Sequence, residues 1–328
     1  MALSRKAKIF QITTSVIFIT IAAVAIFQRQ AILDWWTLRN YTPASAVAQL
    51  ADQSTMTDTG KRIFYLNDPK IQDKASFYNS CKFGENTIVL GCYTKNDGIF
   101  VLKVDDPRLS GVEQVTAAHE MLHAAYDRLS TKEKVDIDNQ LNTFYNTLQD
   151  AEVRSKIELY RKNGANITNE LHSILGTEVE TLTPALEKYY AKYFANRSKV
   201  VAYTKQYENE FISRKNKVAD LDSQLSSIEQ KVVANNAELN AQQQSINAES
   251  DRLDSLLRSG NVEAYNAAVP AYNRRIPAFN ALVSQTEALV ARYKEILTER
   301  NKIAVEAQEL NKALNSSIQS ASDPIQNL

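Results

Sequence analysis

A strict seven-residue repeat of apolar side chains dominates the chain from about residue 211 onward. It constrains this region to long helices, because apolar residues seven apart form one stripe along an α-helix. The first series consists of Phe211, Val218, Leu225, Val232, Leu239, Ile246 and Leu253. A companion series contains Leu221, Ile228 and Leu256 and is interrupted by Asn235, Gln242 and Glu249. The pattern is typical of a coiled coil with a polar middle.

A second heptad series follows a break at Gly260. The segments "AYNAAVP", "AYNRRIP" and "AFNALVS" repeat with a period of seven from Ala264 to Ser284. Two heptad helices joined by a short glycine turn predict an antiparallel, left-handed coiled-coil hairpin, which we assign to residues 196–318. Pro270 and Pro277 lack a backbone N–H and are expected to bend the second helix. The hairpin is a candidate surface for a protein partner or for self-association.

The N-terminal segment predicts export from the cytosol. Residues 9–27 carry no charged side chain and are long enough to cross a hydrocarbon core of about 30 Å as a helix. Basic residues precede this segment, so the positive-inside rule places residues 1–8 in the cytosol and the rest outside. The competing interpretation is a cleaved signal peptide, because Ala23-Val24-Ala25 resembles a cleavage site. Both interpretations give an extracytoplasmic protein, held at the cell membrane by one span or secreted.

The two cysteines are consistent with export. Cys81 and Cys92 flank a region with turn signals, next to strands predicted at residues 87–90 and 99–104. Two cysteines eleven residues apart around a turn can form one disulfide in an oxidising compartment. The alternative is a pair of buried free thiols.

Charge and local signals limit the remaining choices. Lys+Arg and Asp+Glu both number 38, and a net charge of zero argues against nucleic-acid binding.

Local signals predict where several helices begin. A helix is predicted over residues 111–129, and a capping box of Ser130 and Glu133 is expected at the start of the next helix. Thr168 is expected to cap a helix over residues 169–176. Thr183 and Pro184 are expected to open the longest helix, and the aromatic run at residues 186–197 is interpreted as core and surface.

The motif "HEMLH" at residues 119–123 carries the chemistry. The chain has three histidines, and two of them, His119 and His123, are four apart on one helix face. Two imidazoles at that spacing can bind one Zn²⁺. Glu120 lies about 100° around the helix and can act as a general base towards the open side of the metal. The alternative is a helix with two partly buried histidines and a surface glutamate.

"HEMLHAAYD" and "NELHS" together resemble the two motifs of the thermolysin-like metallopeptidases, the gluzincins. The resemblance covers two helices, with Asn169, Glu170 and Ser173 matching the second motif. It implies one Zn²⁺ per chain with Glu170 as third ligand, and it implies that Asp127 orients a ligand imidazole. His172 and Glu178 lie close by and remain alternative third ligands. His172 can otherwise act behind the ligands or in the oxyanion role.

These observations predict an α+β fold. A linker at residues 28–44 leads to a small zincin-like domain at residues 45–195, followed by the hairpin and by a tail at residues 319–328. A transmembrane helix precedes them. The strand "GIFVLKV" at residues 98–104 is a candidate for binding the substrate backbone, with a plain core strand as the alternative.

The expected function is an extracytoplasmic, membrane-anchored zinc metallopeptidase that acts on a peptide or protein substrate. The main alternative is a cell-envelope scaffold whose coiled coil binds partners and whose zinc site is structural or idle. A third interpretation is hydrolysis of a non-peptide amide in the cell wall.

Overall fold

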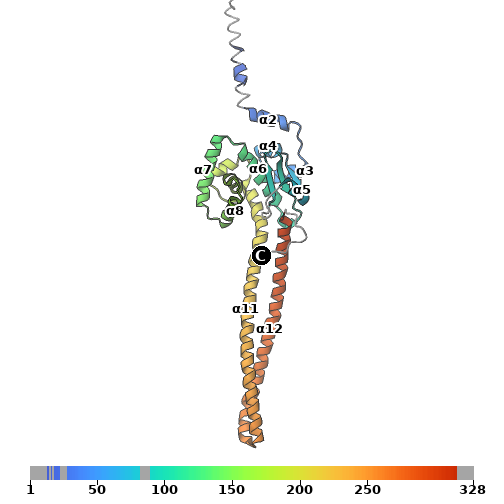
Figure 1. The fold of residues 1–328 in the computed structure, drawn as a ribbon, viewed down its shortest axis with the longest axis vertical. Helices are drawn as coiled ribbons and strands as arrows, with labels where there is room; N and C mark the ends of the chain where they lie inside the picture. Colours follow the sequence, from blue (N-terminus) through green and yellow to red (C-terminus); the bar gives the residue numbers. More distant parts are fainter. Residues whose placement is uncertain (1–12, 15, 17, 23–27, 82–88, 316–328) are drawn as a thin grey trace, which may run out of the picture. The chain divides into compact units, whose positions relative to one another are not determined.

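The computed structural model describes residues 13–14, 16, 18–22, 28–81 and 89–315 (Figure 1). The chain divides into two compact units. The first unit comprises residues 1–208 and 313–328, and the second comprises residues 209–312. The boundary predicted at residue 195 leaves out Val200 and Val201, which are buried in the first unit.

The first unit is mainly helical and contains a small sheet (Figure 1). Its elements are α2 (Arg29–Leu38), α3 (Ser45–Gln53), α4 (Asp58–Leu66), β1 (Lys70–Gln72), α5 (Lys74–Ser80), β2 (Gly91–Thr94), β3 (Gly98–Leu102), the 3-10 helix η1 (Pro107–Leu109), α6 (Val112–Asp127), α7 (Thr131–Thr147), α8 (Ala151–Lys162), α9 (Ile167–Thr177), α10 (Pro184–Tyr190) and the beginning of α11 (Arg197–Arg258).

Polar side chains fix where several of these helices begin. Ser130 and Glu133 form the capping box that the sequence predicts for α7. Asn166, rather than Thr168, caps α9 by accepting a hydrogen bond from the backbone N–H of Asn169. These caps satisfy backbone donors that a helix cannot pair internally.

The longest helix does not begin at Pro184. Thr183 caps α10, which ends after two turns at Tyr190, and the long helix α11 begins at Arg197. The backbone N–H of Thr57 donates to the carbonyl of Tyr193, and the N–H of Ala195 donates to the carbonyl of Thr55. These long-range bonds hold the intervening residues out of a helical conformation, which sequence signals near Pro184 do not reveal.

Helix α6 occupies the centre of the first unit. It packs against α3, α4, α9 and the strands β2 and β3, and most of its side chains are buried. It directly follows Gly111, whose φ of +102° lies in the left-handed region that favours glycine. A Cβ atom there would lie 2.9 Å from Cβ of Tyr203. The predicted active-site helix is therefore the element around which the core forms.

The sheet has the order β1-β3-β2, with β1 parallel and β2 antiparallel to β3. Strand β3 is central and buried along its whole length. Both of its edges are paired, so the predicted role of residues 98–104 in binding a substrate backbone is wrong. In the described sheet the edge next to α6 belongs to β2. The predicted disulfide between Cys81 and Cys92 is confirmed and links the end of α5 to β2.

The predicted fold class is wrong. The three strands contain only 3, 4 and 5 residues, and helices form nearly all other regular structure. The described residues therefore form a helical protein with a small sheet, not an α+β zincin domain. The apolar run at residues 99–104 correctly indicates β3, whereas the strand predicted at residues 87–90 is not found at residues 89–90, and residues 87–88 lie outside the described part. Short runs also do not determine how many strands associate.

The predicted transmembrane helix is also not found. Among the residues that the structure describes, no helix is long and apolar enough to cross a membrane. Residues 9–12, 15, 17 and 23–27 of the predicted span lie outside the described part, as do residues 1–8 and 319–328. The longest described stretch of the span, residues 18–22, is far shorter than the roughly 20 residues that a span needs.

The second unit consists of the remainder of α11 and most of α12 (Val262–Leu314), which run antiparallel from the turn at Gly260 (Figure 1). Leu221, Leu225 and Ile296 form a buried apolar cluster between the two helices. Nδ2 of Asn235, in the polar part of the seam, donates to Oγ1 of Thr286 at 3.0 Å. Helix α12 continues through Pro270 and Pro277.

Candidate metal centre

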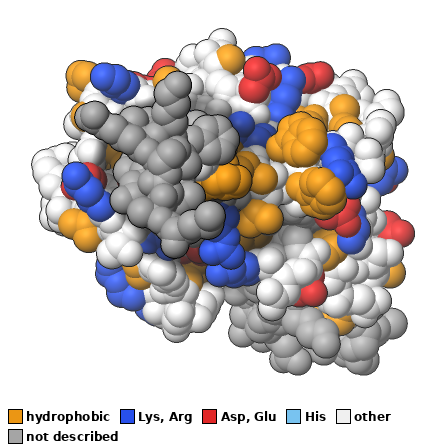
Figure 2. All heavy atoms as spheres, turned by 90° about the horizontal axis from the view of Figure 1, so that it is seen from above, with side chains coloured by type: hydrophobic (Ala, Val, Ile, Leu, Met, Phe, Trp, Pro, Cys, Tyr) orange, Lys and Arg blue, Asp and Glu red, His pale blue; other side chains and the backbone are white. Residues whose placement is uncertain are grey.

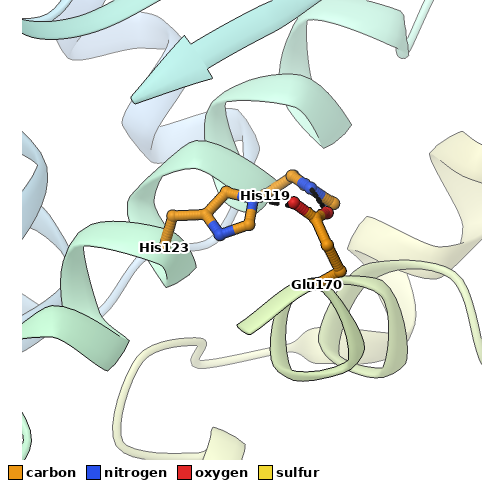
Figure 3. A group of neighbouring side chains, drawn as sticks. All are labelled: His119, His123 and Glu170. Carbon is orange, nitrogen blue, oxygen red and sulfur yellow. Dashed lines mark ion pairs between the residues drawn. The ribbon is translucent and has the colours of Figure 1, made fainter. Parts of the chain in front are cut away.

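Helices α6 and α9 bring two imidazoles and one carboxylate together (Figure 3). Nε2 of His119 and Nε2 of His123 each lie 3.7 Å from Oε2 of Glu170. The candidate ligand atoms of the three residues all lie within 4.8 Å of one another. Their side chains are 13%, 12% and 14% exposed. The group could therefore hold a metal ion, and it is the only such cluster among the described residues.

The geometry of Glu170 tests whether a metal ion fits. Oε2 of Glu170 is buried and has no hydrogen-bond partner among the described residues. At 3.7 Å the two imidazole nitrogens are too far away for hydrogen bonds. Ligand distances of about 2.0–2.1 Å in a tetrahedral zinc site place neighbouring ligand atoms roughly 3.3 Å apart. The two distances from Glu170 exceed this value by only a few tenths of an ångström, and an ion held by the three residues would also satisfy the buried oxygen.

Burial and nearby charges shift the pKa values of the three candidate ligands in different directions. Burial, together with the nearby His119, lowers the pKa of His123 to about 4. Burial also opposes protonation of His119, but Glu170 and Glu120 outweigh it and raise its pKa. Burial opposes ionisation of Glu170, but the two histidines outweigh it and lower the pKa of this carboxyl. The site is therefore arranged for a neutral His123 beside an ionised Glu170.

A neighbouring amide orients His123. Nδ1 of His123 lies 3.1 Å from Oδ1 of Asn169. With the amide oxygen accepting, the Nδ1–H donates, which leaves the lone pair on Nε2 free to bind a metal ion. Asp127, for which the family resemblance implies this orienting role, instead accepts a hydrogen bond of 3.3 Å from the hydroxyl of Tyr93.

Glu120 lies between α6 and the outer edge of β2. Its side chain is buried, and burial raises its pKa to about 7, with a lowering contribution from His119. The backbone N–H of Tyr93 donates to this carboxylate. A Cβ atom at Gly91 would lie only 2.8 Å from Cγ and Oε1 of Glu120. Glycine is therefore required for the carboxylate to approach the strand this closely.

The hydrogen-bond register between β2 and β3 determines which backbone groups of β2 face outward beside Glu120. The backbone N–H of Leu102 donates to the carbonyl of Leu90, so in this antiparallel register the hydrogen bonds to β3 come from Leu90, Cys92 and Thr94. The backbone groups of Gly91 and Tyr93 therefore face away from β3. They form the outer edge of the described sheet, where the Tyr93 N–H donates to Glu120.

The two alternative third ligands lie elsewhere. His172 is fully buried, and its Nε2 lies 2.8 Å from the hydroxyl of Tyr189. The rings of Tyr126, Tyr190 and Tyr193 also surround it, at centroid distances of 5.3–6.5 Å. Burial lowers the pKa of His172 to about 3. It is a neutral core residue in this structure.

Glu178 belongs to a different network of charged side chains. Its Oε2 lies 2.6 Å from Nζ of Lys156, which also contacts Glu208 at 2.8 Å. Lys156 thus joins α8 to the end of α9 and the beginning of α11. This network holds together the helices around α9. Because Glu178 is paired with Lys156, Glu170 is the carboxylate that faces the two histidines.

The structure adds three residues that sequence reasoning left without a role at the site. Asn169 stands inside a motif that the sequence identifies, so its position was the available signal. Burial and the charges of Glu170 and Glu120 raise the pKa of Tyr160 on α8. Gly91 gave no signal, because its importance depends on packing against a helix some thirty residues away.

Arg197 clamps the far end of α9. It donates to the backbone carbonyls of Val179 at 2.6 Å and Glu180 at 2.8 Å, and its Nε lies 2.9 Å from Oε2 of Glu187. The guanidinium is buried, so these bonds help to fix the position of the helix that carries Glu170.

Comparisons with protein-family models, curated proteins and solved structures find no match for the chain. The case for a function therefore depends on the geometry of this site.

Proposed function

We propose that the protein is a zinc-dependent peptidase in which His119, His123 and Glu170 hold the metal and Glu120 is the general base. The observation that carries the proposal is the buried, unpaired Oε2 of Glu170, equally distant from two imidazole Nε2 atoms. Two imidazoles and one carboxylate form a ligand set typical of catalytic zinc. A second buried carboxylate one residue from the first ligand is what hydrolysis requires and a purely structural site does not.

Bound zinc would lower the pKa of a water molecule and polarise the scissile carbonyl. Glu120 takes the proton from the attacking water and passes it to the nitrogen of the leaving amine. A carboxyl with a pKa of about 7 is suited to both transfers near neutral pH. The Tyr93 N–H orients the carboxylate during these steps.

The outer edge of β2 favours a peptide as the substrate. Extended peptides bind exposed strand edges through backbone hydrogen bonds. The outward backbone groups of Gly91 and Tyr93 lie directly beside Glu120. A peptide paired there would have its scissile bond near the general base, whereas a small non-peptide amide would not use this edge.

The disulfide between Cys81 and Cys92 supports an oxidising compartment as the place of action. It joins β2 to the end of α5, so the edge beside Glu120 is covalently attached to the neighbouring helix. Reduction is therefore expected to loosen the edge without removing a metal ligand.

The decisive experiment compares wild type with Glu120→Gln. Both proteins are loaded with zinc, and metal content and cleavage of casein and a peptide library are measured with and without a chelator. We expect equal zinc content and a loss of hydrolysis of at least about 100-fold in the variant, because only the base is removed. Glu152→Gln, an exposed carboxylate on α8, is the matched control and should keep full activity.

Other results would contradict specific parts of the proposal. Equal turnover by Glu120→Gln and wild type would exclude Glu120 as the base. Iron in place of zinc after purification would contradict the metal assignment. Stoichiometric zinc with no cleavage of any peptide would favour the coiled-coil scaffold with an idle site.

A further inference from the structure

Helix α2 exposes four large apolar side chains to solvent. Ile32 is 49% exposed, Leu33 54%, Trp35 65% and Trp36 59%. Figure 2 looks onto this end of the first unit and shows hydrophobic side chains grouped next to Lys and Arg side chains. Large apolar groups that gather on a surface mark a place where a protein meets a partner or a membrane.

A buried ion pair fixes α2 to the first unit. Asp34, the buried residue of α2, lies 2.5 Å from Nη2 of Arg128 and 3.8 Å from Nε of Arg62. Arg128 directly follows α6, the helix that carries His119 and His123. The ion pair fixes the Asp34 side of α2 to the end of α6. The opposite side of α2 therefore faces solvent.

The charged residues at the two ends of α2 are basic. Arg29 begins α2 and Arg39 follows it, and the guanidinium of Arg39 lies 3.5 Å from the centroid of the Trp36 ring. Asp34 is the only acidic residue in α2, and its charge is buried and paired. The outward face thus combines indole rings and aliphatic side chains with basic groups, which complements an anionic lipid surface.

The chain before α2 extends this apolar surface in the sequence. Val16, Phe18, Ile19 and Ile21 are each more than half exposed. A protein partner would cover a patch of limited area, whereas a lipid surface accommodates apolar residues on consecutive segments of one chain. This continuity favours lipid over a protein as the occupant.

We infer that α2 is an interfacial helix that binds the surface of an anionic bilayer. Trp35, Trp36 and the neighbouring Ile32 and Leu33 enter the boundary between headgroups and acyl chains. Arg29 and Arg39 contact lipid phosphates. Because Asp34 ties α2 to the end of α6, the bound bilayer sets the orientation of the first unit. The inference does not depend on whether the metal centre is catalytic.

The two tryptophans make a direct test possible. They are the only tryptophans in the chain, so its indole fluorescence reports on α2 alone. The full-length protein is titrated with vesicles of phosphatidylcholine and phosphatidylglycerol, with and without phospholipids brominated on the acyl chains. We expect a blue shift of the emission, quenching by the brominated lipids and loss of quenching by aqueous iodide.

Charge reversal separates α2 from the rest of the chain. The double variant Arg29→Glu and Arg39→Glu should weaken binding to the anionic vesicles by at least roughly 25-fold, because loss of each positive charge alone weakens binding about fivefold. Arg292→Glu, an exposed arginine on α12, is the matched control and should leave binding unchanged.

Three results would overturn the inference. If the protein floats with the vesicles while its indoles stay accessible to iodide and are not quenched by the brominated lipids, another segment binds the lipid. If the indoles become protected without vesicles because the protein self-associates, a second copy of the chain covers α2. Equal affinity of the double variant and the control would likewise exclude recognition of lipid charge by Arg29 and Arg39.

Discussion

Nδ1 of His123 lies 3.1 Å from Oδ1 of Asn169, the residue immediately before Glu170. Helix α9 therefore provides both the carboxylate that faces the two imidazoles and the acceptor that fixes the tautomer of one of them. A single displacement of α9 relative to α6 would disturb both contacts. The integrity of the site thus depends on how these two helices pack.

The Asn169→Ala variant should bind zinc 10- to 100-fold more weakly than wild type, because His123 loses its orienting acceptor. Asn169→Asp keeps an acceptor oxygen and should recover most of the affinity. Zinc affinity is measured by competition with a chromogenic chelator, and the exposed Asn142→Ala is the control. If Asp127→Ala weakens binding while Asn169→Ala does not, the orienting role belongs to Asp127.

Glu170→Ala should release zinc, whereas His172→Ala and Glu178→Ala should retain it. His172 fills a fully buried site among tyrosines, so its removal should instead lower the free energy of unfolding by about 2–4 kcal/mol. Metal content and thermal unfolding are measured on the same preparations. Release of zinc by His172→Ala in a folded protein, with retention by Glu170→Ala, would show that the third ligand is assigned incorrectly.

Gly91→Ala should reduce hydrolysis strongly while zinc stays bound. The new Cβ would lie 2.8 Å from Oε1 of Glu120 and 2.4 Å from Cγ2 of Thr116, so the carboxylate must move from the strand. Gly164→Ala is the control, since no atom lies within 4 Å of its Cβ position. Its φ of +75° limits the effect to a stability loss of about 1 kcal/mol. Undiminished turnover in Gly91→Ala would mean that the position of Glu120 is not critical.

Glu187→Gln should destabilise the protein near neutral pH and much less in acid. Its hydrogen bond to Arg197 holds the pKa of Glu187 below its usual value of about 4.3. The folded state therefore binds fewer protons than the unfolded state near that pH. The resulting stability is present above about pH 4.3 and is lost as the pH falls through the folded pKa. Melting temperatures from pH 7 to pH 3 should converge for wild type and variant, and a constant difference would exclude an ionic origin.

The polar pair of the hairpin should show measurable coupling. Asn235 and Thr286 face each other across α11 and α12 at 3.0 Å. A double-mutant cycle with Asn235→Ala and Thr286→Val should give a coupling free energy of about 0.5–1.5 kcal/mol. Asn247 and Gln243, which bond within α11, provide a control cycle that does not report on the pairing of the helices. Zero coupling for the first pair would mean that the helices pair in another register in solution.

Features set by local spacing could be predicted from the sequence. His119 and His123 share one face of α6 because they are four residues apart, and Ser130 and Glu133 form a capping box because they occupy the N-cap and N3 positions of α7. The disulfide followed from two cysteines around a turn. Each of these predictions required only the geometry of one element or one short connection.

Features that depend on contacts between distant segments could not be predicted in this way. The small sheet and the central position of β3 depend on how β1 returns to pair with it. The break before Arg197 depends on backbone bonds to Thr55 and Thr57. Neither leaves a periodic signal in the sequence, which is why the predicted fold class and helix boundary were wrong.

The sequence by itself determined that two imidazoles lie on one helix face with a carboxylate beside the first, and it predicted one disulfide and two long heptad helices. Only the tertiary structure decided that Glu170 faces the imidazoles while His172 enters the core and Glu178 pairs with Lys156. All three candidates lie in or directly after α9, so periodicity could not choose between them. The choice depends on which side of α9 packs against α6, and that is set by the burial of side chains contributed by many separate elements.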